Sequence, residues 1–115
     1  MSAFRLLLIA LLLAVVLYTI PVVANHGLLV LLPTFFGDMA RMAWPGQFNL
    51  DFFGFLLLSG FWTAWRNEFS LPGIALGVVA VFGGIPFLTA YLLILSYRSR
   101  GDVKVMLLGE RRAKA

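Results

Sequence analysis

Three long runs of apolar residues, separated by short polar segments, dominate the sequence. The first run covers 6–24, the second covers 48–65 and the third covers 71–97. The first and third runs contain no charged residue, and the only charged residue in the second run is Asp51. A helix needs about 20 predominantly apolar residues to cross roughly 30 Å of hydrocarbon, and a segment in lipid has to satisfy its own backbone hydrogen bonds. The pattern therefore predicts an all-α membrane protein with three transmembrane helices.

The third run is longer than a straight crossing requires. As a helix its 27 residues would rise about 40 Å, so the helix has to tilt, bend or project from the membrane. Ser70 is suited to cap its beginning, and Pro72 is tolerated in the first turn. Pro86 cannot donate to the carbonyl of Phe82, which predicts a bend within 82–86. We interpret this bend as a packing feature rather than a gating hinge.

A shorter amphipathic segment is predicted between the first and second runs. Over 34–44, apolar residues recur at helical spacing on one side and polar residues recur on the other. The apolar set is Phe35, Met39 and Met42, and the polar set is Thr34, Asp38 and Arg41. This pattern is typical of a helix lying flat in the membrane interface, with Trp44 at headgroup level and Pro45-Gly46 at its end. A re-entrant dip over 28–36 is the alternative.

Composition supports a membrane location. Hydrophobic residues make up 62% of the 115 residues, charged residues make up 12%, and there is no cysteine. A soluble domain would be about a quarter charged, so an ordinary soluble enzyme, a disordered tail and a disulfide-stapled secreted domain are excluded. Arg5, Pro21 and Ala24 make a cleaved signal peptide the alternative for 6–24. We expect this run to be retained, because a signal peptide usually has an apolar stretch of only about 7–15 residues.

Basic residues are concentrated in the segment 98–115. It holds six of the nine Lys and Arg residues, and such residues near the ends of transmembrane helices are retained in the cytoplasm. With three crossings this tail lies on the same side as 25–47, which predicts a cytoplasmic tail and an N-terminus outside. The tail would attract anionic lipid. It has no aromatic residue to stack on bases, so we expect no nucleic-acid partner.

A group of polar residues is predicted to meet at one membrane boundary. With three crossings, the residues on that side are His26, Asp38, Arg41, Asp51, Arg98 and Arg100, and the candidate ligand-binding residues among them are His26, Arg41, Asp51 and Arg98. A carboxylate at the edge of hydrocarbon is costly unless it is paired, so we expect Asp51 to pair with Arg98 or Arg41. We interpret the group as an ion-paired lock between helices, with a shallow binding site for an anionic headgroup or a quinone-like ligand as the alternative. One histidine without cysteine predicts neither a metal site nor a cofactor.

Small residues recur at helical spacing on the second and third runs. In lipid such residues mark helix contacts, because they allow two backbones to approach closely. They are Gly60 and Ala64 on the second run, and Gly73, Gly77, Ala80 and Gly84 on the third. These stripes would pack against each other within one chain, form a homo-oligomer or dock on a larger membrane protein, and the spacing alone does not separate these cases.

Several short phrases of the sequence occur together in one known family. They are Asn25-His26-Gly27, Pro33 to Asp38, Trp44 to Asn49 with Asp51, Ser59-Gly60 to Trp65-Arg66, and Gly101-Asp102-Val103-Lys104 to Arg111. Over 18–112 the chain resembles an uncharacterised family of small bacterial membrane proteins with about three predicted transmembrane helices. The resemblance implies a bacterial inner membrane, and it carries over no catalytic residue.

The function that the sequence favours is non-catalytic. We expect a membrane protein that acts by helix packing, as an accessory or assembly subunit or as a homo-oligomer. One alternative is the binding or transport of a small amphiphilic or anionic ligand at His26, Arg41 and Asp51. Another is a holin-like pore former, by analogy of layout alone. An enzyme is the least favoured class, since it would need catalytic groups from other subunits or a bound cofactor.

Overall fold

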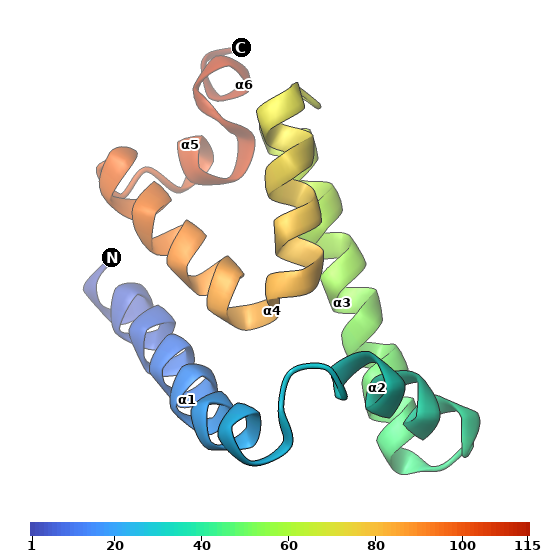
Figure 1. Ribbon diagram of the computed structural model, residues 1–115. Helices are drawn as coiled ribbons and strands as arrows, with labels where there is room; N and C mark the ends of the chain where they lie inside the picture. The colour runs from blue at the N-terminus through green and yellow to red at the C-terminus, as the bar shows by residue number, and fades with distance from the viewer.

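The computed structural model describes all residues from 1 to 115, and it consists of helices joined by short turns, without strands (Figure 1). The helices are α1 (Ser2–His26), α2 (Leu31–Ala40), α3 (Trp44–Arg66), α4 (Leu71–Arg98), α5 (Val103–Leu108) and α6 (Glu110–Lys114). The predicted all-α architecture is confirmed. Two of the helices, α1 and α4, are long and apolar enough to cross a membrane.

Helix α2 and the beginning of α3 differ from the single interfacial helix expected over 34–44. Helix α2 begins at Leu31, and the chain reverses at Met42, which has a φ of 55°. Trp44 and Pro45 then open α3 instead of closing the helix before it. Proline suits this place, because the first N–H groups of a helix have no intrahelical partner and the proline ring fixes a helical φ. Pro45 therefore begins α3, whereas Pro45-Gly46 was expected to end the helix before it.

Helices α3 and α4 pack through their small residues. Gly60 and Gly77 approach each other so closely that a Cβ on either residue would lie 2.8 Å from the other's carbonyl oxygen. Ala64 and Ala80 are buried in the same contact, and Gly73 approaches Asn67 at the α3–α4 turn. Most of the small residues of both stripes thus meet inside one chain.

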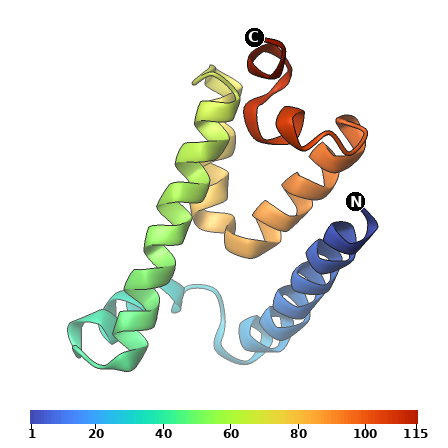
Figure 2. The same cartoon turned by 180° about the vertical axis from the view of Figure 1, so that it is seen from behind.

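Helix α4 is interrupted at its centre. Gly84 has φ 58° and ψ −142°, a backbone conformation that favours glycine, so the bend predicted within 82–86 is confirmed in position. The bend is a reversal: residues 71–83 run along α3, and residues 85–98 run back toward the end at which α4 began (Figure 1, Figure 2). Each half rises only about 20 Å, which is less than the roughly 30 Å of a bilayer core.

The returning half of α4 contacts the beginning of α1 and the end of α3. The Arg5 guanidinium donates to the hydroxyl and to the carbonyl of Ser96, both at 2.9 Å. The side-chain amide of Asn67 donates to the Tyr91 hydroxyl at 2.8 Å. The beginning of α1, the α3–α4 turn and the end of α4 therefore lie together at one end of the molecule.

The segment 98–115 folds onto this same end. Arg66 donates to the carbonyl of Met106 at 2.6 Å, and the indole N–H of Trp62 donates to the carbonyl of Leu107 at 3.1 Å. The tail and the loop that follows α1 are consequently at opposite ends (Figure 1). The expectation that both emerge at a common boundary is wrong, because it required α4 to run straight, and α4 reverses at Gly84.

Candidate functional site

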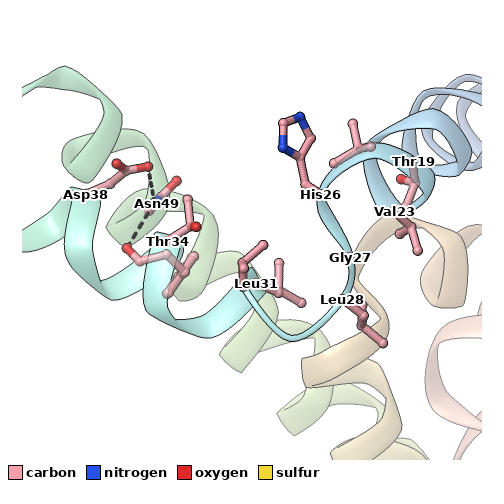
Figure 3. A pocket seen from close by; sticks show the side chains of 12 residues that line it. Thr19, Val23, His26, Gly27, Leu28, Leu31, Thr34, Asp38 and Asn49 are labelled. Atoms are coloured by element: carbon pink, nitrogen blue, oxygen red, sulfur yellow. Dashed lines mark hydrogen bonds between the residues drawn. The ribbon is translucent and has the colours of Figure 1, made fainter.

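A cleft of about 500 Å³ opens where α1 ends and faces α2 and α3 (Figure 3). Ligand sites commonly have volumes of about 300–1,000 Å³. We call this cleft of α1, α2 and α3 the His26 cleft. Its lining residues are Thr19, Val22, Val23, His26, Gly27, Leu28, Val30, Leu31, Thr34, Phe35, Asp38 and Asn49.

The two walls of the His26 cleft are held apart by the loop between α1 and α2. Gly27 ends α1 with a φ of 79°, and its N–H donates to the carbonyl of Val23 at 2.8 Å. On the other wall, α2 is fixed to α3 by the amide of Asn49, which donates to the Phe35 carbonyl at 3.1 Å. Gly46 allows α2 and α3 to approach closely, because a Cβ at this position would overlap the carbonyl oxygen of Asp38.

The cleft contains polar groups that have free hydrogen-bonding capacity. The His26 imidazole and the Thr34 hydroxyl make no hydrogen bond within the chain, and they project from different walls (Figure 3). The Asp38 carboxylate accepts from the Asn49 amide at 3.5 Å and lies 3.7 Å from the guanidinium of Arg41. Both distances are long for charge-assisted contacts, so Asp38 retains most of its capacity to accept.

An apolar groove of about 540 Å³ continues from the cleft along α1 toward the reversal of α4. The two cavities share Thr19 and Val23, and the groove reaches Pro86, next to the break at Gly84. Every residue over 17–34 is exposed, so the other helices cover little of this half of α1. The site therefore has polar groups at its mouth and apolar walls beyond them.

The group of site residues predicted from sequence is only partly assembled. His26 lines the cleft, whereas Arg41 lies outside it, 80% exposed, in a contact with Asp38 three residues away. Asp51 is exposed on α3 and makes no ion pair. Arg98 lines a different small cavity, beside Arg66 at the far end of α3.

The expected pairing of Asp51 with Arg98 is therefore corrected. Arg98 lies beside Arg66, and 15 residues of α3 separate Arg66 from Asp51, a rise of about 22 Å. The physical reason is again the reversal at Gly84, which returns the end of α4 to the side where it began.

Sequence reasoning missed Asn49 and Thr34 as site residues, whereas Asp38 was expected at the same boundary as His26. Asn49 is a half-buried amide near the beginning of a mainly apolar helix, and its spacing from Asp51 puts these two residues on different faces of α3. A polar residue in the first turns of an apolar run was the available signal. The sequence alone could not show that Asn49, rather than Asp51, faces α2.

Charge is sorted between the two ends of the molecule. The end at the α3–α4 turn, which we call the basic end, carries eight of the nine Lys and Arg residues. They are Arg5, Arg66, Arg98, Arg100, Lys104, Arg111, Arg112 and Lys114, with Glu68, Asp102 and Glu110 among them. The end with the His26 cleft carries only Arg41, with Asp38 and Asp51. No three His, Asp or Glu side chains lie close enough together to hold a metal ion.

Comparison of the chain with models of protein families, with curated proteins and with solved structures gave no match.

Proposed function

We propose that this chain is a non-catalytic protein of the bacterial inner membrane that binds a membrane amphiphile in the His26 cleft. The observation that carries the proposal is the continuity of a polar mouth with an apolar groove that reaches Pro86. A lipid-like molecule has the same division along its length, with a polar head beside an acyl chain. Its head would lie among the polar groups of the cleft, and its chain would lie along α1.

In this proposal α1 and α3 cross the membrane. Helix α4 would be long and apolar enough to cross if it were continuous, but it is broken at Gly84 and enters and leaves from the cytoplasmic side as a hairpin. The half-helices of α4 are too short to cross alone, and non-helical backbone at membrane depth is tolerated where protein surrounds it. Gly84 is partly covered by Phe52 and Leu56 of α3, which would lie 3.2 and 3.6 Å from a Cβ there.

The orientation follows from the sorting of charge. Basic residues are retained in the cytoplasm, so the basic end, with eight of nine Lys and Arg residues, would face inward. The His26 cleft would then open at the outer leaflet, with α2 in its interface. Residue 1 would lie inside, in contrast to the outward placement that three crossings predicted.

The proposal is tested by labelling with a photoactivatable phospholipid that carries a diazirine on its acyl chain, in proteoliposomes of defined composition. Mass spectrometry should find more adducts over 16–34 than on the exposed residues Phe55, Leu58 and Phe61 of α3. Excess unlabelled phospholipid should reduce only the adducts over 16–34. Val23→Trp would fill the groove and should abolish the excess. Leu17→Trp, on an exposed position of α1 that lines neither cavity, should leave it unchanged. Uniform labelling of all lipid-facing residues would contradict the proposal.

A helix of another membrane protein is the second candidate occupant. It is favoured by the exposure of the whole stretch 17–34, which is a large apolar surface to leave without protein contact. The small residues of α3 and α4 do not favour it, because most of them are used within the chain. Blue-native electrophoresis separates the candidates: loss of a larger complex in Val23→Trp, with unchanged lipid labelling, would favour the helix.

A further inference from the structure

The polar mouth of the His26 cleft contains an acceptor of hydrogen bonds that carries negative charge. Asp38 is the only carboxylate among the twelve lining residues, and its side chain is 25% exposed. It is held by α2 on the wall opposite to His26 (Figure 3). Its contacts with Asn49 and Arg41, at 3.5 and 3.7 Å, leave room for a closer donor.

The mouth also contains donors that have no acceptor within the chain. The His26 imidazole donates through one ring nitrogen in either neutral tautomer, and the Thr34 hydroxyl donates as well. Neither side chain makes a hydrogen bond in the structure. Two donors of this kind suit the oxygen atoms of a phosphodiester.

No Lys or Arg lines the cleft. Arg41 is the only Lys or Arg at this end, and its side chain is 80% exposed and is not among the lining residues. A head group with only negative charge would therefore meet the Asp38 carboxylate, whose one cationic neighbour is the solvent-exposed Arg41 at 3.7 Å, and like charges brought together in a site are unfavourable. Anionic lipid is better matched by the basic end, in the opposite leaflet.

From these observations we infer that the head group bound in the cleft is zwitterionic, with a primary ammonium group beside Asp38 and its phosphate beside His26 and Thr34. The ligand class is an ethanolamine-type phospholipid, in preference to an anionic glycerol-type phospholipid. This inference rests on the proposed binding function and adds the chemistry of the ligand. A primary ammonium group has three donors, so it can reach both oxygen atoms of a carboxylate, which a quaternary ammonium group cannot do by hydrogen bonding.

The test is competition for the excess labelling over 16–34 in proteoliposomes made mainly of phosphatidylcholine. Phosphatidylethanolamine and phosphatidylglycerol with the same acyl chains are added separately as competitors. We expect phosphatidylethanolamine to compete about fivefold better than phosphatidylglycerol, as befits one partly exposed charge-assisted contact. Phosphatidylcholine keeps the charge but lacks the N–H donors. Adding more of this bulk lipid should therefore reduce the labelling less than adding the same amount of phosphatidylethanolamine.

Variants of two aspartates give the matched control. Asp38→Asn should remove the preference for phosphatidylethanolamine, because the amide keeps the shape of the side chain without its charge. Asp51→Asn makes the same change of charge on an exposed face of α3 outside the cleft, so the preference should remain. If Asp38→Asn fails to fold, the competition series on the unmodified protein decides the question by itself.

The possible results separate the inference from the function on which it rests. Equal competition by the two lipids, or stronger competition by phosphatidylglycerol, would overturn the zwitterionic head group while labelling in the groove still supports amphiphile binding. Absence of any excess labelling over 16–34 would overturn both. Loss of the preference in Asp51→Asn would show a general effect of surface charge and would also overturn the assignment to Asp38.

Discussion

Replacing Gly60 with alanine should loosen the contact between α3 and α4. A Cβ at this position would lie 2.6 Å from Val81 Cγ2 and 2.8 Å from the carbonyl oxygen of Gly77. Non-bonded carbon atoms prefer separations of about 3.5–4.0 Å, so the two helices have to move apart by close to an ångström or Val81 has to leave its position. Either adjustment opens a contact that buries Ala64 and Ala80.

The magnitude can be isolated with a second substitution on the same helix. Alanine is favoured over glycine in helices by about 1 kcal/mol, which would partly mask the clash in Gly60→Ala. Gly54→Ala has the same propensity term, but nothing lies within 4 Å of its Cβ. The difference in the free energy of unfolding between the two variants therefore reports the overpacking alone. We expect Gly60→Ala to be less stable than Gly54→Ala by about 1–3 kcal/mol.

Unfolding in mixed micelles with increasing sodium dodecyl sulfate, followed by tryptophan fluorescence, measures this difference. Trp62 and Trp65 report on the relevant part of α3 because they flank the buried Thr63 and Ala64. Equal free energies of unfolding for the Gly60 and Gly54 variants would refute the described contact. A double variant that also carries Gly77→Ala should cost less than the sum of the single changes, since one separation of the helices relieves both clashes.

Three further outcomes are expected. Gly84→Ala should destabilise the protein by about 1–3 kcal/mol in the same assay, because φ 58° is strained for any residue with a Cβ; unchanged stability would argue against the reversal. Arg66→Gln should release the tail, since two donated hydrogen bonds, including one of 2.6 Å to Met106, are lost, and limited proteolysis should then cleave after residue 98 faster than in the unmodified protein. Cysteines introduced separately at His26 and Val105 should react with a membrane-impermeant maleimide from opposite sides of the membrane, and labelling of both from one side would contradict the two-crossing arrangement.

Helix positions could be predicted well from the sequence because they depend on local properties. The run over 6–24 lies within α1, and Ser70 caps α4 as expected, accepting from the Gly73 N–H at 3.2 Å. The break near Pro86 was predicted for the same reason, since a missing N–H acts on the residues directly before it. Hydropathy and capping are read from neighbouring residues, and no tertiary contact is needed to interpret them.

The candidate site could be predicted only in part because it depends on the direction of the chain after each break. His26 was identified as a polar residue at the end of an apolar helix, and that local property holds. The expected grouping of His26 with Arg98 required both residues to lie at the same membrane boundary. Arg98 lies there only if α4 runs straight. Proline and glycine in the middle of an apolar helix indicate that it bends, but they do not indicate by how much.

The distribution of charge indicates which path α4 takes, straight or reversed. With a straight α4, seven basic residues would lie on the side of Arg41 and two on the side of Arg5 and Arg66. With α4 reversed at Gly84, eight lie at one end and Arg41 alone at the other. Basic residues resist translocation wherever they flank a crossing, so the reversed path leaves only Arg41 to be translocated, whereas the straight path requires two basic residues to be moved across. The basic residues that flank the bent apolar segment α4 on both sides, Arg66 and Arg98, thus support the proposed hairpin over a crossing.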